Sequence, residues 1–269
     1  MRIFQPYFFD CALPSPVTDS GPLNAIILLD LVPVIADSAP RSFNSTAKEF
    51  ADRITDKTSA ILAVHTGGEP LDIEAISKLA KEKNIKLLED CSQATGASIS
   101  GKKVGTFGDI AAYSTMYRKN LAAGASGGVV YTKDLELYRK SIAYADRGKQ
   151  PWRTDINQND PGFAMFPALN FNTDEFSCAI GIASLERLDE TIAGRLSFLK
   201  ELAANWEGIK FCELYRFNDG FSPFFHPVIV DTDKISCSKV DFAKALAAEG
   251  IPLNLHYGCV IDDWEWAKN

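Results

Sequence analysis

The 269-residue chain has few of the residues that mark a metal site, a disulfide framework or a nucleic-acid surface. Its three histidines are His65, His226 and His256, and none forms an HxxxH pair, so we expect no bound metal. The six cysteines lie far apart without a CxxC pair, as is typical of reduced thiols. The net charge is −7 and the basic residues are scattered, so nucleic acid is not an expected partner.

Long hydrophobic runs are also absent. No stretch approaches the roughly 18 apolar residues of a membrane span, and residues 1–16 lack the long apolar core of a signal peptide. The sequence therefore predicts a soluble, cytoplasmic protein without a membrane partner. With 46% hydrophobic residues, the chain is long enough for one large core or two unequal ones.

The middle of the chain alternates between strand and helix patterns. Residues 59–66 (SAILAVHT) form a short run rich in branched side chains, which favours a parallel strand covered on both faces. Residues 71–84 have apolar residues at helical spacing, with Asp72 as the expected N-cap. A further strand is expected at 85–90 (IKLLED). This alternation indicates an α/β fold with a mainly parallel sheet and flanking helices.

Two more short strands are expected at 108–114 and 127–132, both buried, joined by the loop that contains Lys119. Residues 172–206 predict one long helix or two in line, starting at Thr173 or Asp174.

The C-terminal part differs in kind, with strands expected at 209–215 and 225–231 and a helix that begins at Ser238 and stops at Gly250. We therefore expect a large domain over 1–189 and a smaller α+β domain over 190–269. In residues 1–40, six prolines are expected to break any long element.

Polar side chains cluster where the expected strands end. Asp90 ends one strand and is followed by a small polar turn that contains Gln93, Ser114 ends the next strand, and Lys119 follows five residues later. Ligands of open parallel sheets bind outside the carboxyl ends of the strands. Taken singly, a strand-end aspartate is more often a turn or cap residue, and a loop lysine is usually solvated. Together they indicate a pocket for an anion with an amine nucleophile, and the residues alone do not name a cofactor.

The stretch LLEDCSQATGASISGKKVGTFGDIAAYSTMYRKNLAAGASGGVVYTKD, which begins at residue 87, resembles the core of the DegT family. These are fold-type I, pyridoxal-phosphate-dependent aminotransferases that act on keto-sugars. The shared order is an acid, small residues, Gln, Gly, then GKKVG, Gly-Asp before a strand, Ser, and Lys-Asn-Leu before a Gly-Gly strand. The resemblance extends over roughly residues 24–257, through LDLVPVIADSAPRSFN, LNFNTDEFSCAIGIASLERLDE and GIPLNLHYG.

Carried over position by position, the resemblance implies that Lys119 forms a Schiff base with the aldehyde of pyridoxal 5'-phosphate. Asp90 would pair with the pyridinium nitrogen, Gln93 would hydrogen-bond the ring hydroxyl, and Ser114 would hold the phosphate. Asn170 matches the Asn of the family's N-aromatic-R motif and would reach the cofactor phosphate of a partner subunit, which implies a homodimer. The implied reaction is the transfer of an amino group from an amino acid to a keto-sugar or nucleotide-sugar.

The sequence also departs from the family pattern. The Gly-Thr helix start that cradles the phosphate has no counterpart, and PSPVTDSG (residues 14–21) lacks the expected stacking aromatic. Asn172 stands where the motif has Arg, and STMYRKN replaces Ser-aromatic-His-Pro-Thr-Lys-Asn. The resemblance thus implies a family member that is short at both ends, with an incomplete C-terminal domain. A non-catalytic relative that serves as a binding or assembly module is the alternative. A related dehydratase is disfavoured because that branch has histidine where this chain has Lys119.

Overall fold

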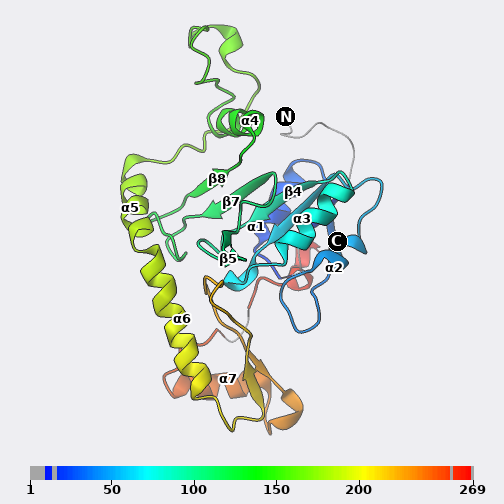
Figure 1. Ribbon diagram of the computed structural model, residues 1–269, viewed down its shortest axis with the longest axis vertical. Helices are drawn as coiled ribbons and strands as arrows, with labels where there is room; N and C mark the ends of the chain where they lie inside the picture. Colours follow the sequence, from blue (N-terminus) through cyan, green and yellow to red (C-terminus); the bar gives the residue numbers. More distant parts are fainter. Residues whose placement is uncertain (1–9, 14–16, 255–256, 268–269) are drawn as a thin grey trace.

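The computed structural model describes residues 10–13, 17–254 and 257–267. His256 and the first three residues of PSPVTDSG lie outside these ranges. The core is a six-stranded sheet in the order β2–β1–β3–β4–β7–β8, in which β8 alone is antiparallel to its neighbour (Figure 1). Its strands are β1 (Asp10–Leu13), β2 (Val32–Ile35), β3 (Ala60–Val64), β4 (Lys86–Asp90), β7 (Ile110–Ser114) and β8 (Gly128–Tyr131). A mainly parallel α/β sheet was the sequence expectation, and it is confirmed.

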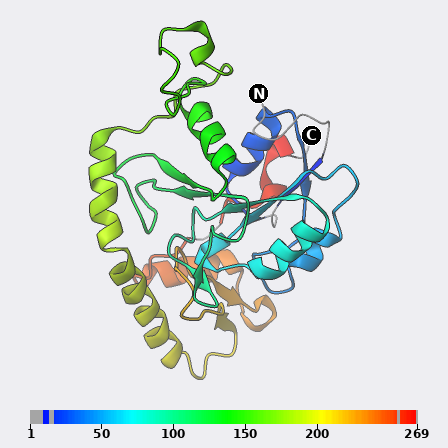
Figure 2. The same ribbon diagram turned by 45° about the horizontal axis from the view of Figure 1, so that its top comes forward.

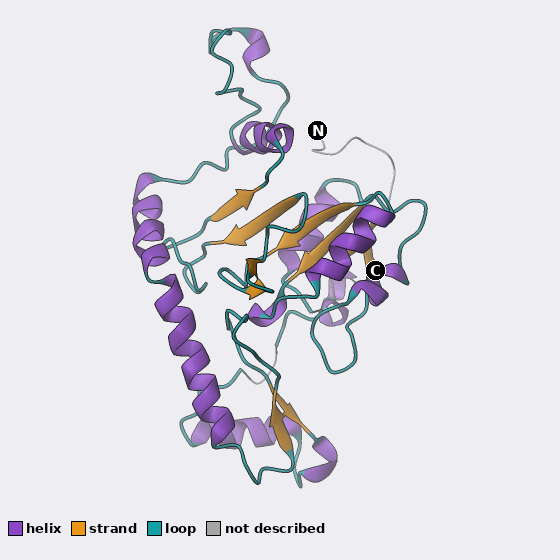
Figure 3. Ribbon diagram, viewed as in Figure 1, coloured by secondary structure: helices purple, strands orange, loops and turns teal. Residues whose placement is uncertain are grey.

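Helices flank this sheet, and a smaller strand pair lies apart from it (Figure 3). The helices are α1 (Ser20–Leu28), α2 (Ala47–Ala51), α3 (Ile73–Glu82), α4 (Leu135–Ala145), α5 (Glu175–Glu186), α6 (Leu188–Ala204) and α7 (Lys239–Ala248). The remaining strands form two antiparallel pairs, β5 (Ser98–Ile99) with β6 (Lys102–Lys103) and β9 (Cys212–Leu214) with β10 (Val228–Val230).

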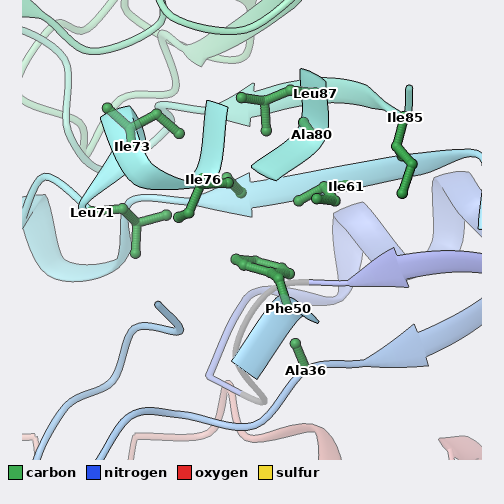
Figure 4. Packing of buried hydrophobic residues seen from close by; sticks show 10 residues of the cluster. Ala36, Phe50, Ile61, Leu71, Ile73, Ile76, Ala80, Ile85 and Leu87 are labelled. Carbon is green, nitrogen blue, oxygen red and sulfur yellow. The ribbon is translucent and has the colours of Figure 1, made fainter. Parts of the chain in front are cut away.

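The alternation of side chains along β3 explains why both faces of the sheet are covered. Ile61 and Ala63 join the cluster formed with α2 and α3, where Phe50 and Ile76 are fully buried (Figure 4). On the other face, Ala60 packs with α1 and with Ile261, so the C-terminal turns lie beside α1 (Figure 2). The sequence expectation of a strand buried on both faces is therefore confirmed for β3.

Three helix starts follow the expected capping chemistry. Asp72 accepts a hydrogen bond from Ala75 N–H (3.2 Å), Asp174 accepts one from Ser177 N–H (2.8 Å), and Ser238 accepts one from Asp241 N–H (3.1 Å). The region 172–206 forms two helices, α5 and α6, which run one after the other along one side of the molecule (Figure 1).

The expectation that the strand at 127–132 is buried was wrong, and the two helices of 172–206 differ in burial. Strand β8 is exposed at all four positions, because it is the last, antiparallel strand of the sheet. In α5, Phe176 (83% exposed) and Leu185 (58% exposed) lie at the surface, whereas α6 buries its apolar stripe. The helical spacing was correct in both helices, but spacing does not show whether another element covers the apolar face.

The proline-rich N-terminal region holds more structure than the sequence suggested. It contributes β1, α1 and β2, of which β1 and β2 belong to the main sheet. Pro33 is tolerated because β2 is an edge strand, and Pro22 lies in the first turn of α1.

The unit of β9, β10 and α7 matches the expected small α+β part in its elements. The boundary at 189/190 stays a prediction; it falls at the start of α6, where Leu188, Ile192 and Leu196 pack on Leu121 and Phe221. None of the helices in the described ranges is long and apolar enough to cross a membrane.

Candidate functional site

Strands β4 and β7 lie side by side in parallel, so their last residues come to the same edge of the sheet. Asp90 ends β4, and its Oδ1 accepts a hydrogen bond from Ser92 N–H (2.9 Å). Ser114 ends β7, and its Oγ accepts one from Met116 N–H (3.3 Å). The two residues thus occupy neighbouring strand ends, which is the position where open α/β sheets bind ligands.

Lys119 lies in a hydrogen-bonded loop between β7 and β8. Its own N–H donates to the Met116 carbonyl (2.9 Å), and Tyr117 N–H donates to the Ala125 carbonyl (2.9 Å). Thr115 N–H donates to the Gly127 carbonyl (2.9 Å), which extends the β7–β8 pairing past Ser114. These bonds fold the loop back on itself, so Lys119 stays near the end of β7.

The surroundings of the Lys119 amine favour its neutral form. Burial lowers the pKa of Lys119, and the negative charges of Asp90 and Asp19 and the Cys259 thiol oppose that effect without cancelling it. The Nζ atom lies 4.5 Å from the centre of the Phe224 ring. Among the described residues, the amine has no hydrogen-bond or ion-pair partner. A half-buried amine with a lowered pKa can act as a nucleophile or a base.

Gln93 lies in the turn after β4 and is buried, with 9% of its surface exposed. Its Oε1 accepts a hydrogen bond from Gly67 N–H (2.7 Å), and its Nε2 donates to the Tyr257 hydroxyl (3.2 Å). The side chain therefore links the turn after β3 to the C-terminal segment. A ligand that used Gln93 Nε2 would have to share it with Tyr257.

Asn170 is placed differently from the other four predicted residues. It is exposed, forms a β-bridge with Asp146 just beyond α4, and accepts a hydrogen bond from Asn172 N–H through its Oδ1 (3.1 Å). In the part of the chain that the structure describes, no hydrogen bond or ion pair joins Asn170 to Asp90, Gln93, Ser114 or Lys119.

A network of hydrogen bonds around the buried Glu89 side chain supports the end of β4. The Glu89 carboxylate accepts hydrogen bonds from the backbone N–H groups of Gly105 (2.7 Å), Phe107 (2.8 Å) and Gly108 (2.6 Å). His65 Nε2 lies 3.3 Å from Glu89 Oε2, while its Nδ1 accepts from Leu71 N–H (3.0 Å). Burial alone would raise the pKa of Glu89, but these partners lower it.

His65, Glu89 and Cys91 lie close enough together to suggest a metal site, with their ligand atoms within 4.8 Å of one another. The hydrogen bonds argue against that use. His65 Nδ1 accepts a hydrogen bond from Leu71 N–H, so the ring hydrogen lies on Nε2, which then has no free lone pair for a metal ion. Burial, together with the charges of Glu89 and Asp90, raises the pKa of the Cys91 thiol well above its usual value. The cluster is a structural support for β4.

Several residues near Lys119 or Gln93 were missed by sequence reasoning. Asp19 caps α1, Tyr257 and Cys259 come from the C-terminal segment, and Phe224 comes from the segment after β9. Each lies far from Lys119 in sequence, and none belongs to a short motif around the lysine. The stretch GIPLNLHYG did point to Tyr257 as part of a family-like segment, but it gave Tyr257 no partner.

The fold and the strand-end residues define an α/β protein with an aminotransferase-type architecture. The family model described as DegT/DnrJ/EryC1/StrS aminotransferase family matches residues 13–265, and the chain belongs to this family.

Three similar proteins illustrate the relationship. GDP-perosamine synthase of Escherichia coli O157:H7 is 34% identical over 64% of this chain and 45% of its own length. A UDP-N-acetyl-3-dehydro-alpha-D-glucosamine 3-aminotransferase of Acidithiobacillus ferrooxidans is 32% identical over 87% of this chain and 59% of its own length. The solved E. coli GDP-4-keto-6-deoxy-D-mannose-3-dehydratase with bound hydrated PLP has a TM-score of 0.86 and 23% identity, covering 98% of this chain and 70% of that one. The chain spans about half the length of the curated relatives it matches.

Proposed function

We propose that this chain is the cofactor-binding part of a pyridoxal-phosphate-dependent aminotransferase that acts on a keto-sugar or nucleotide-sugar. The observation that carries the proposal is the half-buried Lys119 amine beside Asp90, at the edge where β4 and β7 end. Two relatives are named as enzymes of amino-sugar formation, and a protein of the same fold is described with bound PLP.

The residues present fit this cofactor chemically. The Lys119 amine has no hydrogen-bond partner in the described ranges, and Asp90 Oδ2 likewise accepts no hydrogen bond there, so both groups are available to a ligand. Lys119 would hold the aldehyde, Asp90 the pyridinium nitrogen, Gln93 the ring hydroxyl and Ser114 the phosphate. Bound PLP would supply an electron sink for the bond-breaking steps.

Each residue of the chain has a distinct role in this proposal. Lys119 would anchor the cofactor and then, as a free amine, move a proton, for which its lowered pKa is suited. Asp90, fixed by its bond from Ser92 N–H and by the Glu89 network one residue earlier, would keep the pyridinium proton in place. Phe224 would limit the access of water to the amine.

We further propose a homodimer in which Asn170 reaches the phosphate of the partner's cofactor. The support for this proposal is that Asn170 is exposed, so its side chain is open to a second copy of the chain. Light scattering of the protein with and without PLP tests this idea, and a monomer that binds the cofactor fully would remove it. A cytoplasmic location also stays a prediction.

The function is tested by titrating PLP into the wild type, Lys119→Ala and Asp90→Asn while recording the absorbance of the cofactor. We expect a shifted cofactor band in the wild type that an amino-acid donor then changes, no such band in Lys119→Ala, and a band that the donor does not change in Asp90→Asn. A wild type that fails to bind PLP would favour the alternative, a non-catalytic relative that serves as a binding module. An Asp90→Asn protein that responds to the donor would show that another acid faces the ring.

A further inference from the structure

The residue after Lys119 is buried and fully engaged. Asn120 is 8% exposed, and its Nδ2 donates hydrogen bonds to Ser222 Oγ (2.8 Å) and to the backbone carbonyls of Ser222 (3.1 Å) and Pro223 (3.3 Å). Its Oδ1 accepts from Arg195 Nη1 (2.5 Å). Asn120 thus joins the lysine loop to a segment about a hundred residues later in the chain.

Arg195 closes the same network from α6. Besides Asn120, its Nη1 donates to the Pro223 carbonyl (2.7 Å). The Arg195 guanidinium therefore contacts the lysine loop through Asn120 and residues 222–224 through the Pro223 carbonyl. It holds these two segments against each other. Charge-assisted hydrogen bonds of this kind are about twice as strong as neutral ones.

The 222–224 segment is fixed on its other side by the turns after β3 and β4. Ser222 N–H donates to the Gly68 carbonyl (3.0 Å), Phe224 N–H donates to the Gly67 carbonyl (3.0 Å), and Ser222 Oγ donates to the Thr95 carbonyl (2.6 Å). The position of the Phe224 ring over the Lys119 amine is therefore set by Asn120 and Arg195 from one side and by the β3 turn from the other.

We propose that Asn120 and Arg195 are positioning residues for Lys119, which hold the lysine loop against residues 222–224 so that Phe224 covers the amine. The inference rests on the proposed function, in which Lys119 is the reacting amine. It adds that the reactivity of Lys119 depends on a contact between the lysine loop, α6 and the segment that connects β9 to β10.

If Asn120 or Arg195 no longer holds Phe224 in place, the pKa of Lys119 should rise. The groups that face the Lys119 amine are Asp90 at the end of β4, Asp19 at the start of α1, Cys259 in the C-terminal segment and the Phe224 ring. The first three favour the charged amine, the Phe224 ring attracts a cation weakly, and burial opposes them and prevails in lowering the pKa. Loosening the cover admits water and weakens the effect of burial, so the pKa of Lys119 should rise.

The test measures the reactivity of Lys119 without cofactor. The full chain is labelled with trace acetic anhydride at a series of pH values, and the acetylated Lys119 peptide is quantified by mass spectrometry to give the midpoint of its pH profile. The variants are Asn120→Ala and Arg195→Lys, neither of which changes the formal charge. The matched controls are Asn205→Ala and Arg187→Lys, whose side chains donate to carbonyls of their own helices (Glu201 and Ala183).

We expect the wild-type midpoint to lie below that of a lysine in a model peptide. Both network variants should move the midpoint upward, the double variant should move it no further than the larger single change, and the controls should leave it unchanged. A purely structural role would lower the melting temperature and leave the midpoint in place. If Asn120→Ala does not fold, Ser222→Ala takes its place.

An unchanged midpoint in the folded network variants, or an equal shift in the controls, would overturn the proposal. Because no PLP is present, this outcome is independent of the test of function. A chain that fails to bind PLP but shows the predicted midpoints would contradict the proposed function alone.

Discussion

The Glu89→Gln substitution tests how much the hydrogen bonds of the buried Glu89 carboxylate stabilise the end of β4. Glu89 and His65 are 1% and 0% exposed, and the carboxylate has two hydrogen-bond donors at each oxygen: Phe107 and Gly108 at Oε1, Gly105 and His65 at Oε2. Glutamine has nearly the same volume, but its NH₂ group must replace one of these oxygens. Whichever orientation it takes, two buried N–H donors then face another donor.

The expected loss of unfolding free energy follows from the two hydrogen bonds that Glu89→Gln removes. Hydrogen bonds to a charged group contribute about 1.5–3 kcal/mol each, so the loss of two should cost roughly 3–6 kcal/mol. His65 cannot easily relieve the conflict by changing tautomer, because its Nδ1 accepts the Leu71 N–H. Domains are stable by only about 5–15 kcal/mol. The substitution should therefore remove a large part of the stability of the sheet.

Urea denaturation followed by circular dichroism measures the effect as a fall in the midpoint with an unchanged slope. Glu82→Gln is the matched control, because Glu82 is exposed and its Oε1 lies 3.9 Å from Lys78 Nζ. Exposed ion pairs of this kind contribute only about 0–1 kcal/mol to stability. A Glu89→Gln protein destabilised by less than about 1 kcal/mol would refute the view that this network supports β4.

Three further predictions concern the same framework. Because the pKa of Glu89 is lowered in the folded chain, its stabilisation is present above the ordinary carboxyl pKa and is lost as the pH falls below it, so wild-type urea midpoints should fall more steeply in acid than those of Glu89→Gln. Gly68→Ala should destabilise far more than Gly101→Ala in the same assay: both glycines have positive φ (93° and 77°), but a Cβ at Gly68 meets the Ser222 carbonyl and one at Gly101 meets open space. Tyr215→Phe removes the 2.6 Å hydrogen bond to the buried Glu69 carboxylate and should cost about 1.5–3 kcal/mol, with faster amide exchange in β9 as the local signature.

The sequence was sufficient for the parts of the fold that depend on local chemistry. The helix that Asp72 begins and the strand that ends at Asp90 lie within a residue or two of their expected limits, because periodicity and capping are local signals. The exposure of β8 was not predictable from its apolar residues, since a short run reads the same at the centre and at the edge of a sheet. Strand β2 was missed because Pro33 obscures the pattern of an edge strand, and β1 was missed because it is only four residues long.

The residues of the candidate site likewise fall into those that the sequence could identify and those that it could not. Asp90, Ser114 and Lys119 could be singled out because each lies at or just after the end of a predicted strand. Phe224, Asp19 and Arg195 could not, because they reach Lys119 or its loop through tertiary contacts made by other segments. The sequence also gave no sign that Glu89, next to Asp90, would be the most heavily hydrogen-bonded acid of the sheet.

The most direct test of the central claim is to identify the residue that holds the cofactor. The protein is incubated with PLP, reduced with borohydride, digested and analysed by peptide mass spectrometry. The account predicts a pyridoxyl group on the peptide that contains Lys119, with labelling lost in Lys119→Ala. A pyridoxyl group on another lysine, or equal labelling of the wild type and Lys119→Ala, would contradict it.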